Sequence, residues 1–271
     1  MSAERAVVVT GASTGIGADA AERLAALGFV VYAGVRDLAS APNAERIRPL
    51  QLDVTDAAQI AAAAATVAAD GIPLAALVGN AGIAVGGPLE DLPLAEFRRQ
   101  FEVNVFGSLA VAQAFLPHLR RVRGRLVLVG SIAGRLSIPF VAPYSASKFA
   151  LRAIADAFRV ELAPAGIAVA LIEPGSVKTP IWAKGRASRE RLMTMLPPEA
   201  IERYGPQLDA VFARTEAEER TGLPVERVGR AIVHAVTAKR PRGSYLIGVP
   251  ARVGSIAAML PASLRDRMIG G

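Results

Sequence analysis

Short, almost wholly apolar runs alternate along the chain with longer helical patterns, and this alternation restricts the possible folds more than any other feature. Runs rich in Val, Ile and Leu are typical of parallel strands covered by helices on both faces. The candidate strands are Ala6–Thr10, Phe29–Val35, Pro49–Asp53, Ala75–Gly79, Arg125–Gly130, Ile167–Glu173 and Ser244–Ile247. The helical patterns are Ile16–Leu27, Ala57–Ala69, Leu94–Leu119 and Ser145–Leu162. We therefore predict a doubly wound α/β fold with a seven-stranded parallel sheet, which binds ligands at the carboxyl ends of its strands.

The length and composition are those of one large core. The chain has 271 residues, 52% of them hydrophobic, and the alternation runs on without a linker, so we expect a single domain over residues 1–271. With no Cys and only two His, a disulfide scaffold and a Cys nucleophile are excluded, and no metal site is expected. The N-terminal segment lacks a signal-peptide pattern, and the longest apolar window, Ala57–Ala69, is shorter than the ~20 residues of a membrane span. We expect a soluble, cytoplasmic protein.

The net charge of +7 is concentrated in the last third of the chain, where residues 180–271 carry 15 basic and 9 acidic side chains. A basic domain is a candidate for binding phosphates or nucleic acid. The segment has no basic run interleaved with aromatic residues and no zinc-finger spacing. We therefore expect no nucleic-acid partner.

A glycine-rich segment joins the first candidate strand to the first helix. It reads Thr10-Gly11-Ala12-Ser13-Thr14-Gly15-Ile16-Gly17. Glycines are needed where a chain turns tightly and backbone N–H groups approach a pyrophosphate at a helix N-terminus. The spacing is Gly-x-x-x-Gly-x-Gly, and no Lys follows as in a Walker loop. An ordinary glycine-rich turn is the alternative.

This spacing resembles the cofactor loop of the short-chain dehydrogenase/reductase family, which has a Rossmann fold, and the resemblance covers roughly residues 5–180. It implies that Asp53 and Val54, after the third strand, contact the adenine. Asn80-Ala81-Gly82 matches the end of the family's Asn-Asn-Ala-Gly motif. Gly79 replaces the first Asn of that motif, which removes a side chain that braces the sheet. The loop residues implied in cofactor binding are Gly11, Ser13, Thr14, Gly15, Ile16 and Gly17.

Tyr144 and Lys148 are four residues apart, on one face of a predicted helix. An ordinary Tyr has a pKa of about 10, and a nearby cation lowers it toward the range useful for acid–base catalysis. Such pairs also occur by chance. Ser131, after the fifth strand, and Asn104, inside an apolar helical stretch, resemble further catalytic positions of the family. Asn is a poor helix former, so a purely structural hydrogen-bonding role is its alternative.

The resemblance implies a role for each of these four residues. Tyr144 exchanges a proton with the carbonyl or alcohol oxygen, and Ser131 orients that oxygen. Lys148 lowers the pKa of Tyr144 and holds the nicotinamide ribose, and Asn104 anchors a water that links Lys148 to solvent. The segment from Pro174 to Thr179 resembles the family's Pro-Gly-x-x-x-Thr element. Its implied nicotinamide-binding residues are Pro174, Gly175, Val177 and Thr179.

The end of the second strand indicates which cofactor is used. An acidic side chain there suits the ribose hydroxyl of NAD, whereas an Arg suits the 2′-phosphate of NADP. The chain has Gly34 at the usual acidic position and Arg36 shortly after it. We therefore predict NADP(H). The alternative is that Arg36 only pairs with Asp37 or Asp53.

Two segments bear on the substrate. Residues 180–225 form a long connection, which is typical of a substrate-binding lid. It carries Ile181, Trp182, Leu192, Met193, Met195, Leu196, Tyr204, Leu208, Val211 and Phe212. These side chains either line an apolar pocket or are the packed faces of two helices. Residues 250–271 look like the amphipathic C-terminal extension of steroid- and retinol-dehydrogenase-like members, which favours a hydrophobic ketone or aldehyde and its alcohol.

Several alternatives remain open. A 3-oxoacyl thioester reductase is one, because the basic last third suits an acidic carrier protein or a coenzyme A phosphate. A non-enzymatic NADP-sensing protein is another. The family resemblance implies a homodimer or homotetramer, formed through the long helix that starts at Leu94 and the helix after Tyr144. The C-terminal extension closes over the substrate, makes a peripheral membrane contact, or packs on its own domain or a neighbouring subunit.

Overall fold

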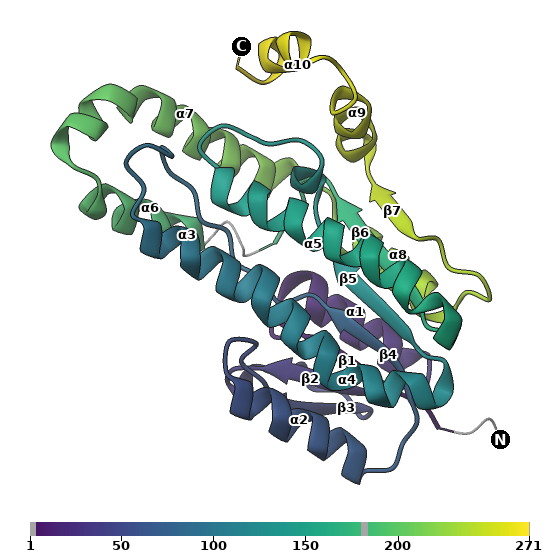
Figure 1. The fold of residues 1–271 in the computed structure, drawn as a ribbon. Coiled ribbons are helices and arrows are strands. Elements are labelled where there is room, and N and C mark those ends of the chain that lie inside the picture. Colours follow the sequence, from purple (N-terminus) through teal and green to yellow (C-terminus); the bar gives the residue numbers. More distant parts are fainter. Residues whose placement is uncertain (1–3, 180–183, 271) are drawn as a thin grey trace.

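The computed structural model describes residues 4–179 and 184–270. All strand pairs in its seven-stranded sheet are parallel, in the order β3-β2-β1-β4-β5-β6-β7, so the predicted sheet is confirmed (Figure 1). The strands are β1 (Ala6–Thr10), β2 (Val30–Val35), β3 (Ile47–Gln51), β4 (Leu74–Gly79), β5 (Arg125–Val129), β6 (Ala168–Pro174) and β7 (Ser244–Ile247). The third strand lies two residues earlier than predicted. It ends before Asp53 because that side chain accepts hydrogen bonds from the backbone N–H and hydroxyl of Thr55, which turn the chain.

Helices cover both faces of the sheet and produce two separate apolar cores (Figure 1). One core lies under α2 (Ala57–Ala69), α4 (Ser108–Val122) and α5 (Ala142–Glu161). The other lies under α1 (Gly15–Ala26) and α8 (Val225–Thr237). Because both faces are covered, most strand residues are buried, as the apolar runs predicted.

The long helical pattern from Leu94 is divided in three. It consists of α3 (Leu94–Phe101), a π-helical segment (Glu102–Gly107) and α4. Asn104 lies in the π-helical segment, where its side chain bonds to the backbone of Ile83. At Gly107 a Cβ atom would lie 2.6 Å from the carbonyl oxygen of Val54, so only Gly lets the helix pass this closely. The single predicted helix is therefore interrupted by the π-helical segment, where it contacts Val54 beyond β3 and Ile83 beyond β4.

Residues 180–225 contain two helices, α6 (Lys184–Met195) and α7 (Pro198–Thr221). Leu192, Leu196 and Leu208 form a small apolar cluster of their own, against which Phe140 packs. Ion pairs connect the two helices to the rest of the molecule. Arg191 lies 2.5 Å from Glu96 on α3, and Arg203 pairs with Glu90. Of the apolar lid residues named above, Ile181 and Trp182 lie outside the described residues.

The C-terminal extension forms two short helices, α9 (Val249–Ala257) and α10 (Ala262–Gly270) (Figure 1). The inner side of α9 buries Ala251 and Ala257. The outer side exposes Val249, Val253 and Ile256, and Met259 just beyond the helix is exposed as well. The extension therefore packs partly on its own domain while leaving an apolar face in solvent. Among the described residues, no helix is both long and apolar enough to span a membrane.

Candidate functional site

A cleft of about 950 Å³, part of it open to solvent, lies at the carboxyl ends of the central strands. It brings together several of the predicted site residues, which are Ile16, Asn80, Gly82, Ser131, Tyr144, Lys148, Pro174, Gly175 and Val177. The remaining predicted residues do not line this cleft, and they are Gly11, Ser13, Thr14, Gly15, Gly17, Arg36, Asp53, Val54, Ala81, Asn104 and Thr179. The cleft is thus where one end of the glycine loop meets the loops that follow β4, β5 and β6.

The glycine loop is held in a conformation that requires its glycines. Gly11 and Gly15 have φ angles of +63° and +60°, in the left-handed region that favours Gly. A Cβ atom on Gly17 would lie 2.3 Å from the carbonyl oxygen of Gly11, so a side chain there cannot fit. The Asn80 side-chain amide donates to the carbonyl oxygens of Thr10 and Gly11, 3.0 Å from each. Asn80 therefore fastens this loop to the end of β4.

The N-terminus of α1 is suited to an anion. Its capping residue, Thr14, makes no side-chain hydrogen bond to the helix, and the first turn carries no acidic residue. The first backbone N–H groups of a helix have no partner within the helix, and the helix dipole places partial positive charge there. Together with the closely packed glycines, this end of α1 fits the pyrophosphate of a dinucleotide.

Tyr144 and Lys148 both lie in the first half of α5, and Ser131 faces them from the end of β5. The Lys148 ammonium is 5.7 Å from the centre of the Tyr144 ring and donates to the carbonyl oxygen of Val129 at 2.9 Å. Ser131 caps a short 3-10 turn, where its hydroxyl accepts from the backbone N–H of Ala133. Ser131 also hydrogen-bonds to Tyr144.

Burial dominates the electrostatics of this pair. It raises the pKa of Tyr144, and the hydrogen bond with Ser131 lowers that pKa by a smaller amount. Burial also lowers the pKa of Lys148 to about 8. In this arrangement burial sets the direction of the Tyr144 pKa shift, and the Lys148 ammonium donates to the carbonyl oxygen of Val129.

Asn104 lies behind the cleft wall and is almost fully buried. Its side-chain oxygen accepts from the backbone N–H of Ile83 at 2.9 Å, and its amide donates to the Ile83 carbonyl and the Ser147 hydroxyl, each at 3.1 Å. Ile83 lines the cleft, so Asn104 braces the wall from outside.

Arg36 is exposed just beyond β2, and its carbonyl oxygen accepts from the Gln51 amide at 2.7 Å. Within the described part of the chain, Arg36 makes no ion pair with Asp37 or Asp53. Asp37 instead accepts from the backbone N–H of Ala39, and Asp53 accepts from Thr55. The alternative in which Arg36 only neutralises a neighbour is therefore not what the structure contains.

Sequence reasoning missed some of the cleft lining. Arg214 and Thr215 reach it from α7, and the buried Ser176 hydroxyl lines it without a protein hydrogen-bond partner. The wall is otherwise aliphatic, with Ile83, Ile132, Ile138 and Val141. Ser176 lies within the recognised Pro174–Thr179 segment, which was a usable signal, whereas nothing in the α7 sequence distinguishes Arg214.

The lid residues that the structure describes and that were expected to line an apolar pocket do not line this cleft. Leu192, Leu196 and Leu208 pack into the separate cluster between α6 and α7 instead. For these residues the alternative of two ordinary packed helices is correct. Only one face of α7, at Arg214 and Thr215, reaches the cleft.

The chain is similar to known proteins both in sequence and in structure. The sequence model of the family described as short chain dehydrogenase matches residues 5–190. An NADPH-dependent 3-dehydrocapnine reductase from Ornithobacterium rhinotracheale is 35% identical, covering 98% of this chain and 94% of that protein. Estradiol 17-beta-dehydrogenase 2 from Mus musculus is 34% identical over 98% of this chain and 74% of that protein. A short chain dehydrogenase from Burkholderia cenocepacia J2315, solved in complex with NADP, superposes with a TM-score of 0.77, 26% identity and 98% coverage of both chains.

Proposed function

This chain belongs to the short-chain dehydrogenase family, and on that premise we propose that it is an NADP(H)-dependent oxidoreductase that interconverts a hydrophobic ketone or aldehyde and its alcohol. One observation carries the proposal. Ser131, Tyr144 and Lys148 share a cleft with the end of a glycine loop that fits a dinucleotide. The relative from Ornithobacterium is named as an NADPH-dependent reductase, which supports the same cofactor here.

In the proposed mechanism, NADPH supplies the hydride when it is bound, and the residues of this chain position and protonate the substrate. Tyr144 donates its phenolic proton to the carbonyl oxygen, and Ser131 hydrogen-bonds to that oxygen. Lys148 binds the nicotinamide ribose, and Asn104 supports the wall through Ile83. Gly11–Gly17 would hold the pyrophosphate of the cofactor, and Asp53 and Val54 would contact its adenine. The carboxyl edge of the sheet would hold it through Asn80, Ala81, Gly82, Pro174, Gly175, Val177 and Thr179.

A substrate panel tests the proposal. Steroids, retinoids, aliphatic ketones and acyl thioesters are each incubated with NADPH or NADH, and nicotinamide absorbance is followed. We expect turnover of an apolar ketone with NADPH, because the cleft wall is aliphatic around the hydroxyls of Ser131 and Tyr144. NADPH binding without turnover of any carbonyl compound contradicts the proposal and favours the NADP-sensing alternative.

The second candidate, reduction of 3-oxoacyl thioesters, is favoured by one observation. Arg214 lies on the cleft wall, and none of the described lining residues is acidic. A coenzyme A phosphate is a suitable partner for a guanidinium. Acetoacetyl coenzyme A is therefore compared with the same acyl group on N-acetylcysteamine, which carries no phosphate. A much lower KM for the coenzyme A ester supports this candidate, and equal KM values remove its basis.

Replacement of Arg36 by Ala is expected to weaken NADPH binding far more than NADH binding. The exposed guanidinium makes no ion pair with Asp37 or Asp53, which supports a contact with the 2′-phosphate. Loss of one charge-assisted contact costs roughly 1.5–3 kcal/mol. Fluorescence titration with both cofactors measures this, and Arg46→Ala, which removes an exposed guanidinium paired with Glu4, is the control. Equal weakening of both cofactors contradicts the assignment.

We further propose that the chain forms a homodimer or homotetramer through the outer faces of α4 and α5. Phe106, Phe149 and Val160 are large apolar side chains exposed there or in the adjoining π-helical segment. Light scattering at micromolar concentration is expected to give at least twice the mass of one chain. A monomer alone contradicts this proposal.

We also propose a peripheral membrane contact through the outer face of α9 and α10. Val253, Ile256 and Met259 are exposed, and the same C-terminal extension carries Arg252 and Arg265, a combination that suits an anionic lipid surface. Sedimentation with anionic vesicles is expected, and it should fall for Ile256→Asp. Failure of the unaltered protein to sediment contradicts the contact.

A further inference from the structure

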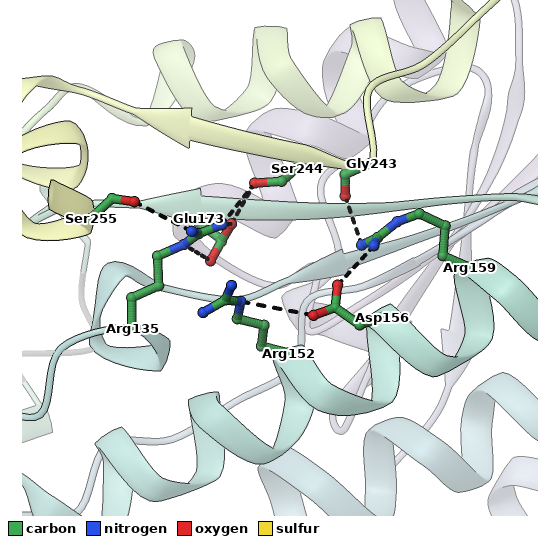
Figure 2. A network of polar contacts seen from close by, with 8 residues as sticks. All are labelled: Arg135, Arg152, Asp156, Arg159, Glu173, Gly243, Ser244 and Ser255. Carbon is green, nitrogen blue, oxygen red and sulfur yellow. Dashed lines mark hydrogen bonds and ion pairs between the residues drawn. The ribbon is translucent and has the colours of Figure 1, made fainter. Parts of the chain in front are cut away.

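A buried ion pair joins two loops of the cleft to the C-terminal extension (Figure 2). The Arg135 guanidinium donates to both carboxylate oxygens of Glu173, at 2.7 and 2.6 Å. Glu173 is fully buried, and the Arg135 side chain is only 18% exposed. A fork of this kind fixes both the distance and the orientation of the two groups, because a planar guanidinium meets a planar carboxylate through two parallel hydrogen bonds.

The two partners adjoin different loops of the cleft, with Arg135 after the Ser131 turn and Glu173 at the end of β6. Arg135 directly follows the 3-10 turn Ile132–Gly134, which Ser131 caps at its N-terminus. Glu173 directly precedes Pro174 and Gly175 at the end of β6. Ser131, Ile132, Pro174 and Gly175 all line the cleft. The ion pair therefore sets the position of the Ser131 turn relative to the loop after β6.

The helix α9 lies against the outer side of both loops. A Cβ atom on Gly254 would lie 2.8 Å from Cγ1 of Ile132, so the helix and the Ser131 turn are in close contact. A Cβ atom on Gly175 would lie 3.3 Å from Cβ of Pro250, at the start of α9. No residue of α9 is among those that line the cleft.

Hydrogen bonds from the same ion pair reach the C-terminal extension. Arg135 donates to the Ser255 hydroxyl of α9 at 3.3 Å, and Ser244 of β7 donates to Glu173 at 2.5 Å (Figure 2). One polar network thus connects α9, β7 and the two cleft loops. The close contact between Gly254 and Ile132 accompanies it. Helix α9 therefore contacts the loops that form the cleft wall without lining the cleft itself.

We propose that Arg135 is a positioning residue for the reaction and that α9 is the support against which it holds the Ser131 turn. The C-terminal extension then controls the rate of turnover without contacting substrate or cofactor. This inference rests on the proposed function. A misplacement of about 1 Å at a reacting group costs roughly 100-fold in rate, so a small shift of this turn is enough.

The first test replaces Arg135 by Lys, which keeps the charge but removes the fork. We expect kcat to fall roughly 10- to 100-fold, with the NADPH Kd within about twofold of the unaltered protein. The pH profile of reduction should also move to higher pH. Ser131 lowers the pKa of Tyr144 through its hydrogen bond, and a displaced Ser131 loses that effect.

The control for this variant is Asp156→Asn. It breaks the ion pair between Asp156 and Arg159, 2.8 Å apart, in the neighbouring part of the same view (Figure 2). Asp156 is half exposed, does not line the cleft and acts on Arg135 only as a nearby charge that weakly raises its pKa, so kcat and its pH profile should not change. A folded Arg135→Lys protein with unaltered kcat and pH profile overturns the proposal. A loss of kcat explained fully by a lower folded fraction, measured by circular dichroism, overturns it as well.

The second test changes α9 itself. Gly254→Ala improves helix propensity by about 1 kcal/mol, yet its methyl group displaces Ile132. We expect a three- to tenfold lower kcat in a protein that melts no earlier than the unaltered one. Gly205→Ala is the matched control, because its methyl group on α7 meets nothing within 4 Å, and it should leave kcat unchanged. Equal kcat in both variants contradicts the role of α9. If the unaltered protein turns over no carbonyl compound, the proposed function itself has failed, whereas normal turnover with insensitive variants defeats only this inference.

Discussion

Tyr144→Phe is expected to reduce carbonyl turnover at least about 100-fold while leaving NADPH affinity nearly unchanged. Removal of a general acid costs roughly 10²- to 10⁴-fold in rate. The Tyr144 hydroxyl is the proposed proton donor, and the Phe ring keeps the shape of the cleft wall. Steady-state kinetics with the best ketone of the panel and fluorescence titration with NADPH give the two measurements. Retention of more than a few per cent of the activity contradicts the assignment.

A matched control is Tyr32→Phe. Tyr32 is also buried, but its hydroxyl donates to Asp70 at 2.5 Å, beside α2 and away from the cleft. Loss of the Tyr32 hydroxyl should lower the free energy of unfolding without changing kcat. If Tyr144→Phe and Tyr32→Phe lose activity equally, the loss in Tyr144→Phe comes from impaired folding and not from removal of the proton donor.

The pH dependence of the unaltered protein follows from the same group. Reduction needs protonated Tyr144, and burial raises the Tyr144 pKa above its ordinary value. The reduction rate should therefore hold through neutral pH and fall only when the pH passes this raised pKa. Oxidation needs the deprotonated form and should increase over that same range. A reduction rate that already falls between pH 6 and 7 contradicts the raised pKa of Tyr144. An oxidation rate that declines toward alkaline pH contradicts it as well.

Glu173→Ala is expected to lower the free energy of unfolding by about 3–5 kcal/mol, the usual cost of removing one partner from a buried ion pair. The Arg135 guanidinium cannot shed its proton and would remain buried without its carboxylate. Ser244 would lose its acceptor as well. Urea unfolding followed by circular dichroism measures the change. A loss below about 1 kcal/mol contradicts the prediction.

Two comparisons separate the buried charge from the loss of side-chain volume. Glu4→Gln removes one partner of the exposed pair with Arg46 and should cost no more than about 1 kcal/mol. The double variant Arg135→Met with Glu173→Leu removes both charges and should recover most of the stability lost by Glu173→Ala. This double variant also lacks the two hydrogen bonds between Arg135 and Glu173, so it should not recover kcat. A stable protein with a low kcat therefore separates the effect on positioning from the effect on stability.

The elements that sequence reasoning predicted best are those whose signals are local. Helix α2 begins and ends at the predicted residues, because Asp56 caps it by accepting from the backbone N–H groups of Ala58 and Gln59. The parallel sheet was predictable because strands covered on both faces must be apolar at nearly every position. The glycine loop was predictable because positive φ angles and close backbone contact leave Gly as the usual choice.

The sequence by itself therefore determined the order of strands and helices, the glycine loop and the residue types that meet at the carboxyl edge of the sheet. Only the tertiary structure decided which distant residues share an environment. It paired Arg135 with Glu173, set Asn104 against Ile83, and brought Arg214 rather than Leu192 or Leu208 to the cleft. The physical reason is the distance along the chain over which each effect acts. Propensity, capping and apolar periodicity act within a few residues, whereas burial, desolvation and ion pairing depend on what the folded chain brings together from far along the sequence.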